Sequence, residues 1–231
     1  MGSIGSNLQE VKRRLARACA DAGRAENSVT LLAVSKTFDA DAVRQAFDAG
    51  QRAFGENYVQ EALAKIDALA ALRPQLEWHL IGPLQSNKTR PVAQAFDWVH
   101  TVDRLKIAER LAEQRPPELP PLQLCLQVNV SGEASKSGAA PGEVAALAAA
   151  VAALPADRVR LRGLMAIPEP AADAGAQRRP HRTLRDLLLA VNAGTGLRLD
   201  TLSMGMSADL EAAVAEGSTL VRVGTAIFGG R

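Results

Sequence analysis

Aromatic residues and excess charge are both scarce in this sequence. Among its 231 residues, Phe, Trp and Tyr make up 3%, and 27 Lys plus Arg oppose 25 Asp plus Glu, so the formal net charge is +2. Proteins that bind nucleic acid need a basic surface or aromatic side chains on which bases can stack. The composition offers neither, and we expect no nucleic-acid partner.

Long apolar runs and cysteine clusters are also missing. The longest apolar run begins at Val144 and is too short and too rich in alanine to span a bilayer, and the N-terminal segment MGSIGSNLQEVKRRL has no secretory core. Cys19 and Cys125 stand far apart and outside any Cys/His cluster, which favours two reduced thiols packed as small apolar groups. We therefore expect a cytoplasmic protein with no membrane segment and no metal.

What the sequence does contain is a regular alternation of short apolar runs and helical patterns. Leu8, Val11 and Leu15 follow each other at spacings of three and four, which predicts an amphipathic helix over about 6–22. Eight candidate strands follow, over about 28–36, 52–56, 76–82, 97–102, 122–130, 159–167, 199–204 and 219–225. Helical patterns follow the first seven strands, over about 40–49, 58–69, 87–95, 104–113, 141–153, 178–192 and 207–215.

This alternation is typical of parallel βα units. Eight such units in about 200 residues fit a closed (β/α)₈ barrel of the TIM type, with an open doubly wound sheet as the alternative. We interpret residues 1–231 as one domain, with the barrel over about 28–228. Asp39, Asn57, Asp103 and Ser207 stand where they predict N-caps of the helices that follow them.

The first predicted strand ends on a charged residue. The segment LLAVSKT, from Leu31, places Lys36 at the carboxyl end of the strand, where barrels of this kind carry functional groups. Desolvation favours the neutral form of a lysine, and the neutral amine is the form that adds to a carbonyl. A lysine that reaches solvent or pairs with a carboxylate explains the segment equally well. The segment alone leaves both interpretations open.

Two later segments have the features of a phosphate site. SMGMS follows the seventh strand and RVGT ends the eighth, the positions at which (β/α)₈ barrels often bind phosphate. Gly205 and Gly224 allow the backbone to approach an anion closely, and Ser203, Ser207 and Thr225 supply hydroxyl donors. Together with the strand-end lysine, these segments predict a pocket for a ligand with an aldehyde at one end and a phosphate at the other.

Six blocks of the sequence resemble one known family. They read AVSKT, FGENYVQE, WHLIGPLQSNK, VNVSGEASKSG, GLMAIP and LSMGMSADLEAAVAEGSTLVRVGTAIFG, in this order between Ser28 and Phe228. They resemble the pyridoxal phosphate homeostasis protein family, also called the proline synthase co-transcribed family. That family is similar in fold to the barrel domain of alanine racemase, the fold-type III class of pyridoxal phosphate proteins. The resemblance implies a protein that binds, stores and delivers pyridoxal 5′-phosphate.

The resemblance also implies roles for individual residues. Lys36 would form the internal aldimine with the aldehyde carbon of the cofactor, and Arg222 would face the pyridine nitrogen. The phosphate would be surrounded by Ser203, Met204, Gly224 and Thr225, with Ser207 at the N-terminus of the following helix, and the ring pocket would be lined by Asn57, His79 and Met165. Without the resemblance, a helix cap would explain Asn57, a core histidine His79, and barrel packing Met165.

Arg222 and Tyr58 favour a carrier over an enzyme. A guanidinium can only donate hydrogen bonds, so a pyridine nitrogen beside it stays unprotonated and the ring is a weak electron sink. Tyr58 is the only tyrosine and lies in the second βα segment, so the acid–base tyrosine that alanine racemases take from a second domain has no counterpart. An amino-acid racemase of fold type III is the alternative. A Schiff-base aldolase on the same barrel and a scaffold without a ligand explain fewer of these features.

Two further lysines and the partners complete the expectations. Lys88 and Lys136 follow strands in polar surroundings, where one could accept the cofactor transiently, although solvated loop lysines are the simpler interpretation. Apo-enzymes that require the cofactor are the expected protein partners. A barrel that is complete without a second domain predicts a monomer.

Overall fold

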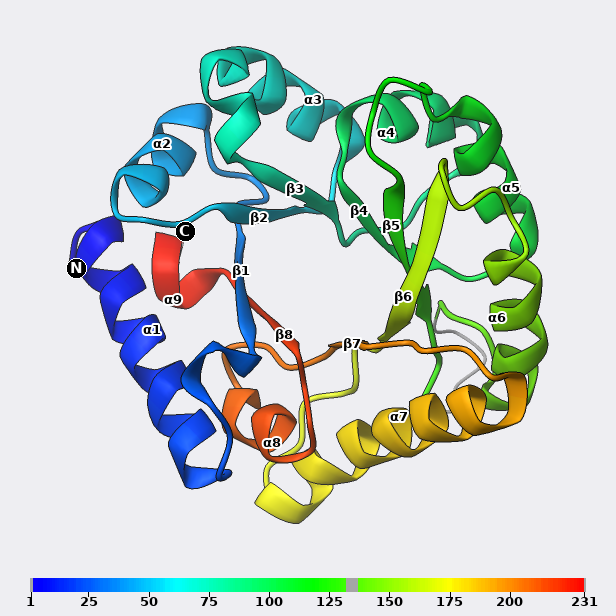
Figure 1. Cartoon of the computed structure of the whole chain (residues 1–231). Helices are drawn as coiled ribbons and strands as arrows, with labels where there is room; N and C mark the ends of the chain where they lie inside the picture. The colour runs from blue at the N-terminus through cyan, green and yellow to red at the C-terminus, as the bar shows by residue number, and fades with distance from the viewer. Residues whose placement is uncertain (1, 132–136, 231) are drawn as a thin grey trace.

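Eight parallel strands form a closed barrel with helices around it (Figure 1). The computed structural model describes residues 2–131 and 137–230. The strands are β1 (Thr30–Val34), β2 (Ala53–Glu56), β3 (Glu77–Leu80), β4 (Trp98–Val102), β5 (Leu122–Gln127), β6 (Val159–Met165), β7 (Thr201–Ser203) and β8 (Leu220–Val223). They pair in chain order, and β8 returns to β1 with Arg222 opposite Leu32. The predicted (β/α)₈ barrel is confirmed, and the open doubly wound sheet is excluded.

Helices cover the outside of this barrel. They are α1 (Ile4–Asp21), α2 (Ala40–Asp48), α3 (Val59–Ala68), α4 (Thr89–Ala95), α5 (Leu105–Gln114), α6 (Val144–Ala152), α7 (Ala174–Thr195), α8 (Leu210–Ala215) and α9 (Thr225–Phe228). Because both faces of each strand are covered, the strands are apolar over most of their length. None of the described helices is long and apolar enough to cross a membrane.

The extra helix α1 takes the place that a long helix after β8 would fill. The segment after β8 forms only the four-residue α9, and α1 packs against α9, α8 and α2 (Figure 1). Its buried stripe contains the predicted Leu8, Val11 and Leu15. Burial of each such side chain contributes about 1.5–3 kcal/mol, so the stripe fixes α1 to the barrel. Asn7 adds a hydrogen bond of 3.0 Å from its side-chain amide to the carbonyl of Ile227.

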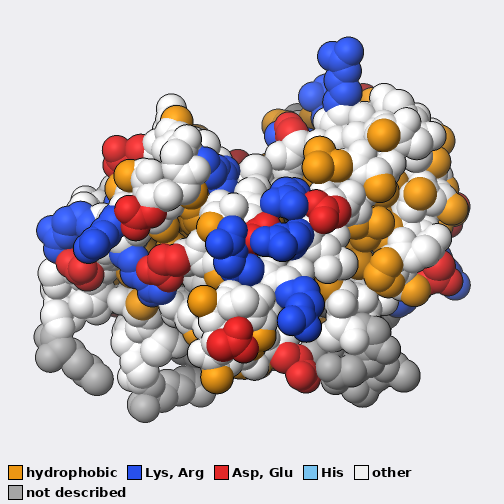
Figure 2. Space-filling model, turned by 90° about the horizontal axis from the view of Figure 1, so that it is seen from below, with side chains coloured by type: hydrophobic (Ala, Val, Ile, Leu, Met, Phe, Trp, Pro, Cys, Tyr) orange, Lys and Arg blue, Asp and Glu red, His pale blue; other side chains and the backbone are white. Residues whose placement is uncertain are grey.

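Ion pairs join α1, α7 and α8 on one face of the molecule. Figure 2 shows Lys and Arg side chains near the centre of this face, with Asp and Glu side chains among them. Arg14 of α1 contacts Glu211 of α8 at 2.6 Å. Glu216, which follows α8, accepts contacts from three arginines of α7, namely Arg178, Arg182 and Arg185, at 2.7, 3.0 and 2.8 Å.

Two predicted helix starts are corrected by the structure. Helix α8 begins at Leu210 rather than at Ser207, because Asp209 accepts a hydrogen bond from the Met206 N–H at 2.7 Å and a 2.8 Å contact from His181, which holds the preceding residues in a turn. Helix α7 begins at Ala174, where the Asp173 side chain accepts from the Ala176 N–H at 2.9 Å. This earlier start places Pro180 inside the helix.

Of the other three predicted helix caps, one is confirmed and two are wrong. Asp39 caps α2 as predicted, since its carboxylate accepts from the Ala42 N–H at 2.9 Å. The N-cap positions of α3 and α5 are occupied by Tyr58 and Arg104, neither of which makes a side-chain capping bond. The predictions of Asn57 and Asp103 as caps are therefore wrong by one residue.

The two cysteines are free and buried, as the sequence indicates. Burial raises the pKa of the Cys125 thiol to about 12. No group of three or more His, Cys, Asp or Glu side chains that could hold a metal ion occurs within 2–131 and 137–230.

Candidate functional site

A cleft of about 640 Å³ opens at the carboxyl ends of the strands. It lies in the volume range of small-molecule sites. Six of the ten residues predicted from the sequence line it: Lys36, Asn57, Ser207, Arg222, Gly224 and Thr225. These residues follow or end β1, β2, β7 and β8, so parallel strands bring them to one end of the barrel.

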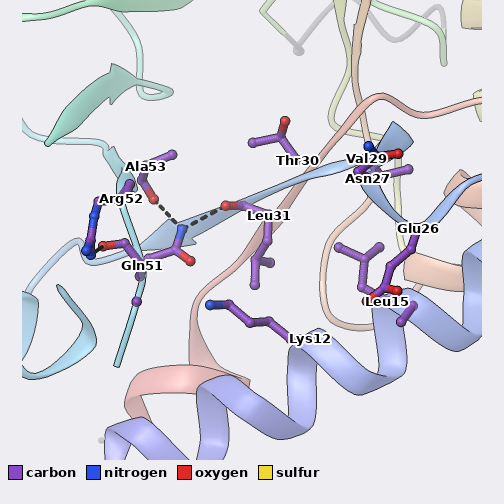
Figure 3. A pocket seen from close by; sticks show the side chains of 12 residues that line it. Lys12, Leu15, Glu26, Asn27, Val29, Thr30, Leu31, Gln51, Arg52 and Ala53 are labelled. Carbon is purple, nitrogen blue, oxygen red and sulfur yellow. Dashed lines mark hydrogen bonds between the residues drawn. The ribbon is translucent and has the colours of Figure 1, made fainter. Parts of the chain in front are cut away.

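A second pocket, of about 670 Å³, opens at the opposite end of β1 and β2 (Figure 3). There the Gln51 amide donates to the carbonyls of Leu31 and Ala53, both at 2.8 Å, and the Lys12 side chain points toward the same space. Burial, and then the charge of Arg52, lowers the pKa of Lys12. Barrels of this kind carry their reactive groups at the other end. We therefore assign function to the carboxyl-end cleft despite its slightly smaller volume.

The lysine of the cleft occupies a turn after β1. Lys36 is exposed, so of the two interpretations of the LLAVSKT segment the lysine that reaches solvent describes this structure. The next residue, Thr37, has a left-handed backbone with φ of 70°, and it is the one non-glycine residue with positive φ in the described part of the chain. The turn therefore carries a backbone conformation that costs roughly 1–2 kcal/mol for a side chain other than glycine.

The backbone after β7 and β8 approaches the cleft closely. Gly205 has φ of 96°, and a Cβ atom there would lie 2.5 Å from the Ala213 Cβ; a Cβ on Gly224 would lie 3.1 Å from the Val34 carbonyl oxygen. The N–H groups of Ser207 and Gly224 make no hydrogen bond within the described residues. Free N–H donors on a tight backbone are suited to an anion.

Arg222 is the second cation of the cleft and is held rigidly. Its side chain is 4% exposed; Nη1 donates to the Ser203 carbonyl and hydroxyl oxygens at 2.6 and 2.8 Å, and Nη2 donates to the Ala166 carbonyl at 2.9 Å. Burial lowers the pKa of Arg222 to about 10, so it remains a cation at neutral pH. No hydrogen bond joins Nε to another described residue. Because no carboxylate occurs among the described residues that line the cleft, the charge balance there favours an anionic ligand.

The sequence of this chain matches the family model of the alanine racemase N-terminal domain over residues 6–231. It is 62% identical to the pyridoxal phosphate homeostasis protein of Pseudomonas aeruginosa, with 100% of this chain and 97% of that protein covered, and 54% identical to the one of Escherichia coli K12, with 100% and 98% covered. The chain belongs to the pyridoxal phosphate homeostasis protein family.

Solved structures agree with this family membership. PipY of Synechococcus elongatus, whose structure was solved with pyridoxal phosphate bound, is 41% identical to this chain and has a TM-score of 0.81. The match covers 93% of this chain and 100% of the PipY chain. Alanine racemase from Corynebacterium glutamicum has a TM-score of 0.69 over 97% of this chain and 59% of its own. At 19% identity this second likeness shows the fold alone.

Four predicted residues of the family site lie beneath the cleft instead of lining it. His79, Met165, Ser203 and Met204 are completely buried. Ser203 is nevertheless connected to the cleft through Arg222, which lines the cleft and donates hydrogen bonds to Ser203. Ser207 lies in the turn before α8 and not at its first residue.

His79 belongs to a buried chain of polar side chains that ends at Arg222. From the half-exposed carboxylate of Glu77, contacts of 2.7, 2.8 and 2.8 Å pass through His79 and His100 to the Ser203 hydroxyl, and Arg222 donates to that hydroxyl. Burial, followed by the charges of His79 and Arg222, holds the pKa of His100 well below its ordinary value near 6.5. His100 is therefore neutral at physiological pH. A neutral imidazole has one donor and one acceptor nitrogen, so His100 can accept a hydrogen bond on one side of the chain and donate one on the other.

Asn57 lines the cleft and carries an unsatisfied acceptor. Its Oδ1 atom is buried and has no hydrogen-bond partner in the described structure. A Cβ on Gly82 would lie 2.2 Å from the Asn57 carbonyl oxygen, so this close packing fixes the Asn57 backbone. A buried acceptor without a partner costs about 1–3 kcal/mol, which a ligand donor would recover. The free N–H groups of the cleft suit an anionic group, and this unpaired acceptor suits a hydrogen-bond donor, so the residues fit a cofactor that carries both.

The apolar lining was not predicted from the sequence. Phe38, Ile81, Ile167 and Met206 complete the walls of the cleft. Ile81 lies one residue past the end of β3 and Ile167 two residues past the end of β6, so the rule that selects residues at the carboxyl ends of strands could have found them. Lys88 does not line the cleft, and Lys136 lies outside the described residues.

Proposed function

We propose that this protein binds pyridoxal 5′-phosphate in the carboxyl-end cleft and serves cofactor homeostasis by storing and delivering it. The observation that carries this proposal is one cleft that combines the Lys36 amine, the Arg222 guanidinium and unpaired backbone N–H groups without a carboxylate among its described lining. The names of the curated relatives and the cofactor bound to PipY support the same assignment.

Each group of the cleft has a place in this proposal. Lys36 would hold the cofactor covalently through its ε-amine, and the Arg222 Nε–H is the donor available to a ring nitrogen. The phosphate would be held by Ser207, Gly224 and Thr225, and polar ring substituents by Asn57. When bound, the cofactor supplies a reactive aldehyde and an aromatic ring that can delocalise electrons. The Ile81 and Ile167 side chains would give the site apolar surface against the ring.

The proposal includes the absence of catalytic turnover. Arg222 cannot protonate a ring nitrogen, which leaves the ring a weak electron sink. Tyr58 is 56% exposed and is not among the residues that line the cleft, so the described lining contains no tyrosine as a second acid–base group. An amino-acid racemase remains the second candidate because Lys36 is itself a base. Incubation of the loaded protein with L-alanine or L-serine and chiral chromatography decides between the two.

We further propose that residues 1–231 act as one cofactor-binding domain, as a cytoplasmic monomer that delivers to apo-enzymes. The closed barrel supports the monomer, because each strand pairs with two neighbours and no strand edge among the described residues is open to a second copy. Sedimentation at several protein concentrations tests the oligomeric state. Reactivation of an apo-enzyme by the loaded protein, in the presence of a scavenger of free aldehyde, tests delivery.

Covalent trapping tests the binding proposal directly. The wild-type protein is mixed with pyridoxal 5′-phosphate, its visible spectrum is recorded, and the mixture is reduced with borohydride before peptide mass analysis. We expect a mass gain on the peptide that contains Lys36 and its loss in Lys36→Ala. A wild-type protein that stays colourless and gains no mass at Lys36 contradicts the proposal.

A further inference from the structure

A buried lysine on α3 lies beside the turn that carries Lys36. Lys65 is 4% exposed; its ammonium group donates hydrogen bonds at 2.6 Å to Glu56 and at 2.7 Å to the carbonyl of Ser35, and it forms an ion pair with Glu61 at 2.7 Å. A buried ammonium is costly unless all its protons find acceptors. Here two hydrogen bonds and an ion pair compensate the charge, and each contact leads toward the turn after β1.

The acceptors of Lys65 are tied to both neighbours of Lys36. The Ser35 hydroxyl donates at 2.6 Å to the same Glu56 oxygen that Lys65 contacts. On the other side, the N–H of Thr37 donates to the Glu61 oxygen that Lys65 contacts. The peptide groups before and after Lys36 are therefore held by one cluster of charged side chains.

The left-handed backbone of Thr37 needs this support. Left-handed residues other than glycine persist where the surrounding structure over-determines them, and they occur often at functional sites. Glu61 holds the N–H of Thr37 itself, and Lys65 holds Glu61 in place. Without these contacts the turn could relax to an ordinary backbone conformation, which would redirect the side chain that precedes it.

We propose that Lys65 and Glu61, together with Glu56, are positioning residues that hold the amine of Lys36 for covalent attachment of an aldehyde ligand. This inference rests on the proposed function, because it assigns the cluster a role toward the cofactor. None of the three side chains lines the cleft, so they act through the turn and not through contact with the ligand. Pre-organised geometry accelerates a bond-forming step because the entropy of orientation is lost on folding.

The experiment separates covalent attachment from non-covalent fit. Lys65→Met keeps most of the side-chain stem and removes the ammonium group. Glu61→Ala removes the acceptor of the Thr37 N–H, and Glu61→Gln keeps an acceptor oxygen. Asp67→Ala is the matched control, since Asp67 is an exposed acid on the same helix. For each protein, the rate of the borohydride-trapped Lys36 adduct with pyridoxal 5′-phosphate is measured beside the affinity for pyridoxine 5′-phosphate, which lacks the aldehyde.

We expect adduct formation to slow about tenfold in Lys65→Met and Glu61→Ala, with Glu61→Gln restoring most of the rate. The affinity for pyridoxine 5′-phosphate should stay within about twofold of wild type in all variants, and Asp67→Ala should match wild type. Wild-type adduct rates in both Lys65→Met and Glu61→Ala overturn the proposal, as does a parallel loss of adduct and of pyridoxine 5′-phosphate affinity. If Lys65→Met does not fold, Glu61→Ala decides. A wild-type protein that binds neither compound contradicts the proposed function instead.

Discussion

The Nδ1 atom of His100 lies 2.8 Å from the hydroxyl oxygen of Ser203, although the two residues are 103 positions apart in the chain. Both side chains are completely buried. Arg222 donates to the same hydroxyl, which leaves the Ser203 O–H free to donate a hydrogen bond to Nδ1 of a neutral His100. This relationship couples the histidine pair inside the barrel to the cation of the cleft.

Removal of His100 should therefore weaken ligand binding through Arg222. In His100→Ala the Ser203 hydroxyl and His79 each lose a partner, which costs about 1–3 kcal/mol for each buried group, and Arg222 loses its fixed geometry. We expect the dissociation constant for pyridoxal 5′-phosphate to rise about tenfold. Leu111→Ala controls for destabilisation alone, because it removes a buried side chain from α5 at a similar cost of about 2–5 kcal/mol. Equal binding losses in both variants would contradict the coupling.

The same histidine predicts a pH dependence of stability. The pKa of His100 is lowered in the folded protein, so the unfolded chain binds its proton first as the pH falls below about 6.5. Stability should be full above that pH and decline below it, by up to about 1.4 kcal/mol per pH unit for one proton. Urea unfolding of wild type and His100→Gln between pH 7.5 and 5.5, a window of about two pH units chosen around the ordinary histidine pKa, measures the effect. An unchanged slope in the variant would show that His100 is not the group responsible.

Gly224 should be needed for the anion end of the cleft. In Gly224→Ala the new Cβ would lie 3.1 Å from the Val34 carbonyl oxygen, a tight contact that a small shift of the backbone beside the cleft would relieve. We expect about a tenfold loss of affinity for pyridoxal 5′-phosphate. Gly142→Ala is the matched control, since a Cβ there meets no described atom within 4 Å. Competition with inorganic phosphate checks that the affinity is lost at the anion end of the cleft. Phosphate should compete with the cofactor in wild type and less effectively in Gly224→Ala.

The barrel itself could be predicted from the sequence because its signals are local. The alternation of strands and helices, and the spacing of Leu8, Val11 and Leu15, depend on near neighbours in the chain. The rule that the carboxyl ends of strands carry the site selected residues from four separate strands that line one cleft. Ile81 and Ile167 were missed, because the apolar side chain that was assigned to the ring pocket was Met165, which is buried and does not line the cleft.

The polar groups that support the site could not be predicted, because tertiary contacts decide their partners. His100 meets Ser203 across 103 positions, and Lys65 meets the Ser35 carbonyl across 30. No pattern in the sequence distinguishes Lys65 from an ordinary helix lysine until α3 packs beside the turn. The start of α8 was misplaced for a similar reason, since His181 of α7 contacts Asp209 at the N-cap position and the Asp209 carboxylate holds the Met206 N–H in the preceding turn.

The cysteines should be unreactive in the folded protein. Burial raises the pKa of Cys125 to about 12, so almost no thiolate is present at neutral pH, and Cys19 is also completely buried. We expect no labelling of either cysteine by iodoacetamide in the native protein at pH 8 and full labelling in urea, as counted by mass. Rapid labelling of Cys125 under native conditions would contradict its burial.

Glu216 should contribute to stability in a pH-dependent way. The side chains of Arg182 and Arg178 hold the pKa of this buried carboxyl at about 2, below its ordinary value near 4.5. Its contribution is therefore complete above pH 4.5 and is lost as the pH falls toward 2. Because the arginines are partly exposed, solvent screening reduces the effect, and we expect Glu216→Gln to lower the free energy of unfolding at pH 7 by about 2 kcal/mol. Urea unfolding should show wild type and variant converging as the pH approaches 2, and a difference that stays constant across this range would exclude the ion pairs as its source.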